Sequence, residues 1–129
     1  MPTTKYVIIA TAYDKRGRII AQANNSYKKT HPLQAYFARL AGLPKKIYLH
    51  AEIACILAAQ AQRIHTLHVV RRDKNGGFSS AKPCPICMLA IRAYQIPKII
   101  FTTEKGTFDV MEISYPKRNG KENERPSKS

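Results

Sequence analysis

The chain has 129 residues, of which 44% are hydrophobic and 23% are charged, and this balance is typical of one soluble globular domain. The longest apolar-rich run, residues 53–61, is too short to span a bilayer, and residues 6–12 are not followed by a signal-peptide cleavage pattern. These features argue against a membrane protein, so we expect an intracellular, cytoplasmic protein without a membrane partner.

Positive charge dominates the sequence. Lysine and arginine together number 22 against eight acidic residues, which gives a net charge of +14. Residues 117–129 contribute +3 of this charge and leave +11 on residues 1–116. A basic excess in the folded part predicts an anionic partner such as a nucleotide or a nucleic acid, although simple solubility is the alternative explanation. We expect one domain at residues 1–115 and a basic, disordered tail at residues 116–129.

Two apolar, β-branched runs open the chain at residues 6–12 and 18–23. The segment between them contains Asp14 and Gly17, which are typical turn residues. This pattern predicts a β-hairpin. A polar loop follows at residues 24–32.

A short amphipathic helix is predicted over residues 33–41, where apolar residues recur at helical spacing. Thr30 supplies a capping hydroxyl before this helix, and Pro32 is tolerated in its first turn. Gly42 and Pro44 follow the last turn, as is typical where a helix ends.

The rest of the chain alternates helices and strands. A helix over residues 50–64 is apolar nearly all round, so we expect it in the core against a sheet. The remaining elements are a strand at 65–70, a polar, basic loop at 71–82, a helix at 84–94, and strands at 98–102 and 108–113. The order β-β-α-α-β-α-β-β predicts an α/β three-layer sandwich, with a mixed five-stranded sheet covered by helices and a parallel β-α-β unit.

A histidine and two cysteines have the spacing of a metal site. Cys84 and Cys87 are three residues apart at a helix start, where their sulfurs can reach one point and the helix N-terminus favours thiolates. An odd count of three cysteines with one C-x-x-C pair indicates metal binding in a reducing compartment. His50 adds an imidazole from the start of another helix. One nitrogen and two sulfurs leave a tetrahedral zinc ion with one open position, which is the catalytic pattern.

Glu52 lies two residues after His50. In the first turn of a helix both side chains can reach the same point, so the carboxylate can touch the water in the open position without replacing it. Zinc lowers the pKa of such a water towards about 7. Glu52 can then carry its proton to a ring nitrogen and to a departing amine, which predicts hydrolytic deamination with Glu52 as the catalytic residue.

Residues 50–52 (His-Ala-Glu) and 83–87 (Pro-Cys-Pro-Ile-Cys) together resemble the motifs of the cytidine/deoxycytidylate deaminase superfamily. The resemblance extends from about Tyr6 to Ile113 and includes small phage-type deaminase-like proteins. It implies a cytidine-deaminase-like fold, one zinc ion per chain and conversion of cytosine to uracil. The alternative is a structural zinc site with an undetected fourth ligand, which leaves Glu52 without a role.

The resemblance also implies residues that bind the substrate. Related deaminases keep an asparagine after the second strand that hydrogen-bonds the ribose or the base. Asn25 is the first candidate for this role and Asn24 the second, although either can be a turn residue. Ala51 would offer its backbone to the base edge. Pro83 completes the set together with Thr30, which can line the pocket or cap the helix.

Several substrates share this chemistry. One is cytosine in a single-stranded polynucleotide, gripped by the basic loop at residues 71–82. Another is free cytidine or deoxycytidylate, with a phosphate bound by lysines of the inserted segment 26–46. A third is adenosine in tRNA, but the sequence departs from that family because Lys82 replaces the usual glutamate before Pro83, and Ile86 replaces a methionine.

An alternative that is not an enzyme is a non-catalytic, zinc-stabilised domain that binds nucleic acid. Glu52 argues against this alternative, because a site without catalytic activity does not need a residue that carries protons.

Small deaminase domains often complete their pockets with residues of a neighbouring subunit, so we expect by analogy a homodimer or a larger homo-oligomer.

Overall fold

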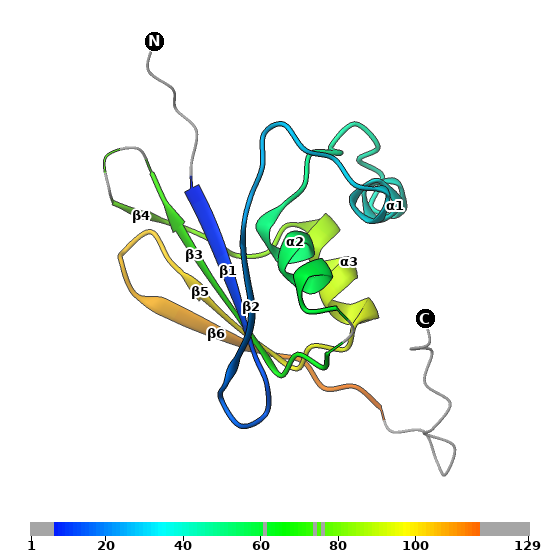
Figure 1. The fold of residues 1–129 in the computed structure, drawn as a ribbon. Helices are drawn as coiled ribbons and strands as arrows, with labels where there is room; N and C mark the ends of the chain where they lie inside the picture. The colour runs from blue at the N-terminus through cyan, green and yellow to red at the C-terminus, as the bar shows by residue number, and fades with distance from the viewer. Residues whose placement is uncertain (1–6, 61, 74, 76, 117–129) are drawn as a thin grey trace.

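The computed structural model describes residues 7–60, 62–73, 75 and 77–116, so most of the expected tail lies outside the described residues. The elements are, in chain order, β1 (Val7–Tyr13), β2 (Ile19–Asn24), α1 (Pro32–Leu40), α2 (Ala51–Ala58), β3 (Thr66–Arg72), β4 (Phe78–Ser79), α3 (Pro85–Ala93), β5 (Lys98–Thr102) and β6 (Phe108–Glu112) (Figure 1). Their bounds lie within one or two residues of the predicted ones, apart from the end of α2 and the additional strand β4.

The turn between β1 and β2 is built around Asp14. One of its carboxylate oxygens accepts hydrogen bonds from the backbone amides of Arg16 and Arg18, both at 2.9 Å. Gly17 has a φ of 84°, which glycine adopts without the strain that a side chain would cause. β1 and β2 pair antiparallel, so the predicted hairpin is confirmed.

The strands form one mixed sheet, in which β2, β1, β3, β5 and β6 are neighbours in that order. β3 and β5 are parallel, with Leu67 opposite Ile99, and α3 lies in the connection between them, so the predicted β-α-β unit is confirmed. The carboxyl ends of parallel strands share one edge of a sheet. At this edge the N–H of Arg71 donates to the hydroxyl of Thr102 at 3.1 Å.

In the part of the chain that the structure describes, the sheet has six strands, and the prediction of five strands is wrong. β4 pairs with the end of β3, where Phe78 lies opposite Arg72. The carboxylate of Asp73 supports the turn between them by accepting a hydrogen bond from the N–H of Gly77 at 2.9 Å. Two residues are too few to show the alternation of a strand. The prediction of a continuous loop over residues 71–82 failed for this reason.

The helices lie on one side of the sheet. α2 packs on β1 and β2, and α1 packs against α3 on the side away from the sheet (Figure 1). Ala10, Ala12 and Ala21 are buried in the two strands under α2, where small side chains let a helix approach closely. A mixed sheet flanked by helices confirms the predicted α/β fold. None of the described helices has the length and hydropathy needed to cross a membrane.

The cap of α1 differs from the prediction. Nδ1 of His31 accepts a hydrogen bond from the N–H of Leu33 at 3.0 Å, so His31 is the capping residue. Thr30 instead forms an isolated β-bridge with Tyr48. The prediction of a Thr30 cap is therefore wrong, because Thr30 is paired across the loop and the next residue carries the cap.

Helix α2 is shorter than predicted. The apolar pattern continues to residue 64, but the helix ends at Ala58. Gln60 has a φ of 53°, and a residue in the left-handed region stops a helix. Ile64 is only 5% exposed although it lies outside the helix. The pattern therefore indicated burial correctly but not helical conformation.

Candidate metal centre and active site

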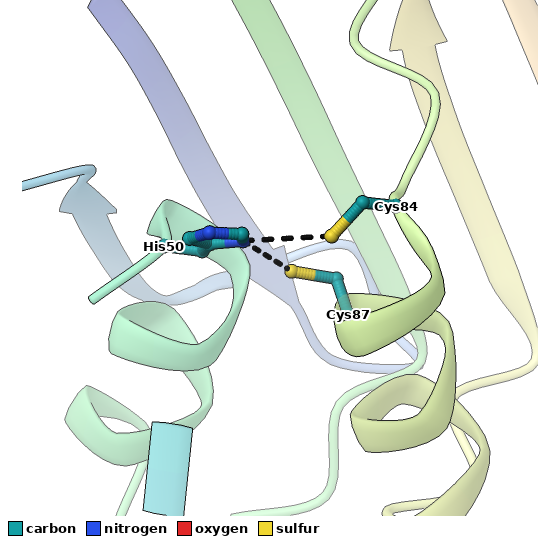
Figure 2. Close-up of side chains that lie close together, drawn as sticks. All are labelled: His50, Cys84 and Cys87. Carbon is teal, nitrogen blue, oxygen red and sulfur yellow. Dashed lines mark hydrogen bonds between the residues drawn. The ribbon is translucent and has the colours of Figure 1, made fainter. Parts of the chain in front are cut away.

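The starts of two helices meet at one point. His50 immediately precedes α2 and Cys84 immediately precedes α3, both in extended backbone conformation, and Cys87 lies in the first turn of α3. The side chain of His50 makes no capping hydrogen bond to α2. Figure 2 shows the imidazole of His50 facing both sulfurs. The residues predicted to bind zinc are thus brought together by the packing of α2 and α3.

The three ligand atoms have the separations that a zinc ion requires. His50 Nδ1 lies 3.3 Å from Cys87 Sγ and 3.5 Å from Cys84 Sγ. Zinc bonds of about 2.0 Å to nitrogen and about 2.3 Å to sulfur, at tetrahedral angles, place these atoms roughly 3.5 Å apart. Among the described residues, no fourth His, Cys, Asp or Glu belongs to this group. We call these three side chains the ligand group; a tetrahedral metal ion held by it keeps one position open.

The two thiols of the ligand group differ in acidity. The hydrogen bond with Cys87, together with the contact with His50, lowers the pKa of Cys84 to about 4 against the opposing effect of burial. The same sulfur contact, together with burial, raises the pKa of Cys87. The hydrogen bond with Cys84 raises the pKa of His50 against the opposing effect of burial. Cys84 is therefore ready to act as a thiolate, the form in which cysteine binds a metal.

Glu52 extends from the first turn of α2 and is only 6% exposed. Burial raises the pKa of its carboxyl. Glu52 lies outside the ligand group but lines the same cavity as His50 and Cys84. A buried carboxyl beside metal ligands can accept a proton from a bound molecule and return it.

Gln34 positions His50, and the sequence analysis missed it. Its side chain is fully buried on α1. Its oxygen accepts a hydrogen bond from the N–H of His50 at 3.1 Å, and its nitrogen donates to the carbonyl of Lys46 at 3.2 Å. Gln34 shares the buried face of α1 with Phe37 and Ala38. A glutamine at that spacing in an apolar face is the signal that could have identified it.

A cavity of about 540 Å³ adjoins the ligand group. This volume lies in the range of small-molecule sites. Most of the lining residues come from two parts of the chain, which we call walls. The first wall comes from segments 25–27 and 45–49, and the second wall comes from Arg71 and segment 80–82.

Of the two candidate asparagines, Asn25 lines the cavity and Asn24 does not. The side-chain oxygen of Asn25 accepts a hydrogen bond from the N–H of Ile8 at 3.0 Å, and the backbone N–H of Asn25 donates to the Ile8 carbonyl at 3.1 Å. Asn24 is the last residue of β2 and pairs with Ile9. The structure therefore favours Asn25 as the residue near a substrate, and its contact with the substrate stays a prediction.

The other predicted substrate-binding residues do not line this cavity. Ala51 is fully buried at the first position of α2. Pro83 is buried directly before Cys84, and Thr30 is exposed. Their roles in substrate binding also stay predictions.

No protein of curated function matches the chain in sequence at a significant level. The sequence profile described as "Cytidine and deoxycytidylate deaminase zinc-binding region" matches residues 2–103. This span includes Glu52 and the whole ligand group, and it runs through β5, the fifth strand along the chain. Because the match covers most of the chain and contains a His/Cys/Cys group that fits one zinc ion, the chain belongs to the cytidine and deoxycytidylate deaminase family of zinc-dependent enzymes.

Proposed function

We propose that the protein is a hydrolytic deaminase that converts cytosine to uracil in a nucleotide or in single-stranded nucleic acid. The observation that carries this proposal is the buried carboxyl of Glu52, in a cavity beside the ligand group. A zinc site that only stabilised the fold would have no use for this carboxyl, whose burial costs free energy. Hydrolytic deamination needs a base and an acid at one place, and Glu52 can be each in turn.

Glu52 is the group that moves protons in this reaction. The ligand group would hold one zinc ion, which when bound supplies a water molecule acidic enough to ionise near neutral pH. Glu52 would accept a proton from the attacking water and donate it to the ring nitrogen of the base, while the water oxygen adds to the amine-bearing carbon. Glu52 then carries the remaining hydroxyl proton to the exocyclic nitrogen. The carbon–nitrogen bond breaks, ammonia leaves, and a carbonyl remains on the ring.

Free deoxycytidylate is the second candidate substrate, because Lys45 and Lys46 line the cavity and can meet one phosphate. Adenosine in tRNA fits the sequence less well, since Lys82 stands where the tRNA adenosine deaminases have glutamate. A non-catalytic domain that binds nucleic acid ranks last, because it gives Glu52 no role.

Ammonia release by the zinc-loaded full chain tests the proposal. The substrates are cytidine, deoxycytidine, their monophosphates, adenosine, and single-stranded DNA and RNA that contain cytosine. We expect a uracil-containing product, identified by mass spectrometry, and loss of turnover after zinc is removed with a chelator. Turnover of adenosine alone, or of none of these substrates, would contradict the proposal.

A further inference from the structure

Four cations line the cavity beside the ligand group. Lys45 and Lys46 belong to the first wall, and Arg71 and Lys82 belong to the second wall. Among the described lining residues, Glu52 is the only acidic side chain, and it is buried. The three lysines are exposed, whereas the arginine is half-buried. Cations around an opening without nearby carboxylates create a field that attracts an anion.

Each wall is held by its own backbone hydrogen bond, and the two walls meet at Ile8, which bonds Asn25 and lies opposite Arg71 in the pairing of β1 with β3. In the first wall, the N–H of Ser26 donates to the carbonyl of Leu49 at 2.9 Å and joins the two segments. In the second wall, the N–H of Ala81 donates to the carbonyl of Thr102 at 2.9 Å, which ties the wall to β5. The cations therefore reach the cavity from two parts of the chain that are far apart in sequence and meet at Ile8.

Aromatic side chains accompany the cations. Tyr27 and Tyr48 line the cavity, and 51% of Tyr48 is exposed. Tyr48 lies two residues before His50, and its backbone is held by the β-bridge to Thr30. Tyr48 is exposed, whereas Glu52 is buried in the same cavity. Aromatic rings beside cations form the surface on which unpaired bases stack.

The geometry points to a binding site for a single-stranded polynucleotide. Lys45 and Lys46 hold a phosphate on one side of the target nucleotide, Arg71 and Lys82 hold a phosphate on the other side, and a neighbouring base stacks on Tyr48. The position of the target base rests on the proposed function. A lone nucleotide carries one phosphate group, which meets one wall and leaves the other wall and the tyrosine unmatched. A strand that crosses the cavity presents a phosphate to each wall and a second base to the ring.

Fluorescence anisotropy with labelled single-stranded oligonucleotides tests this inference. The zinc-loaded full chain is titrated with DNA and RNA in separate arms, at several salt concentrations. Lys82→Ala should weaken binding several-fold and reduce the slope of log affinity against log salt by about 0.7, the value for one phosphate contact on a single strand. Tyr48→Ala should weaken binding about tenfold without changing the slope, because stacking is not ionic.

Matched controls use exposed residues far from the cavity. Lys15 lies in the turn between β1 and β2, at the opposite end of β1 from Ile8, which lines the cavity. Tyr94 follows the last turn of α3 and is 45% exposed, much like Tyr48. Lys15→Ala and Tyr94→Ala should leave affinity and salt slope unchanged.

Three outcomes would overturn the inference. They are an equal loss of affinity in Lys15→Ala and Lys82→Ala, unchanged oligonucleotide binding in Tyr48→Ala, and no oligonucleotide binding by a chain that deaminates the free nucleotide. Oligonucleotide binding with the expected variant pattern but without deamination of any base would support the inference and overturn the proposed function. The two failures are therefore distinguishable.

Discussion

The ligand group and the walls of the cavity are built in opposite ways. Cys87 is fully buried, and the ligand atoms lie at the starts of helices, at separations that suit one small ion. The walls come mainly from loops, and their lysines and Tyr48 are exposed to solvent. The contrast teaches that the framework of the fold holds the reaction chemistry, whereas substrate choice depends on side chains that can change without disturbing that framework.

Loss of a metal ligand should have the largest effect. In Cys87→Ala we expect loss of zinc and of activity. At free zinc a thousandfold above its Kd, binding adds about 4 kcal/mol to stability, so its loss lowers Tm by roughly 15 °C for a domain of this size. Metal analysis and thermal denaturation measure these changes. Cys55→Ala is the control, since Cys55 is buried outside the ligand group and should keep zinc. Full zinc in Cys87→Ala would refute the ligand assignment.

Glu52→Gln should abolish most of the deaminase activity without changing the zinc content. The amide has nearly the shape of the carboxyl but cannot accept and return a proton, so we expect kcat to fall by about 10²–10⁴. Zinc content should stay at one ion per chain, because Glu52 lies outside the ligand group. Steady-state kinetics and metal analysis on the same preparation provide both numbers. A variant with unchanged kcat would rule out the assigned mechanism.

Gln34 connects the two regions of the comparison, because it bonds both His50 and Lys46. Gln34→Leu leaves the N–H of His50 and the carbonyl of Lys46 without these partners and removes two hydrogen bonds, which should cost about 1–3 kcal/mol in the free energy of unfolding. We also expect weaker zinc binding, measured by competition with a chelator, because His50 loses its support. Gln62→Leu, at an exposed position after α2, should cost less than about 1 kcal/mol. Equal effects of the two changes would argue against a positioning role.

The smallest effect concerns the cap of α1, the helix that carries Gln34. His31→Ala removes the side-chain acceptor for the N–H of Leu33 and should destabilise the protein by about 1 kcal/mol. Thr30→Ala, the neighbouring control, should change the unfolding free energy by no more than about 0.5 kcal/mol. Urea denaturation compares the two. A larger effect at Thr30 would restore the original prediction of the cap.

The reacting residues could be predicted because they occur in short motifs. His50 and Glu52 are two residues apart, and Cys84 and Cys87 are three apart. At a helix start, such spacings bring side chains to one point whatever surrounds them. Most strands and helices were predictable for a related reason, since their periodicity is a property of neighbouring residues.

Other features could not be predicted from neighbouring residues, because they depend on contacts between distant parts of the chain. β4 has two residues and exists only because the end of β3 lies beside it. α2 ends early because the chain must turn at Gln60 to enter β3, although the apolar pattern continues. Gln34 acts on His50, sixteen residues away, through a contact that depends on where α1 packs.

The chain's local patterns alone determined the ligand group, the carboxyl of Glu52 and the order of strands and helices. Only the tertiary structure decided that Asn25 and not Asn24 reaches the cavity, and that Tyr48 stands among lysines from two walls. The physical reason is the distance along the chain over which each feature is encoded. Motif spacing and periodicity act between near neighbours, whereas a cavity wall joins segments that meet only after the sheet and helices have packed.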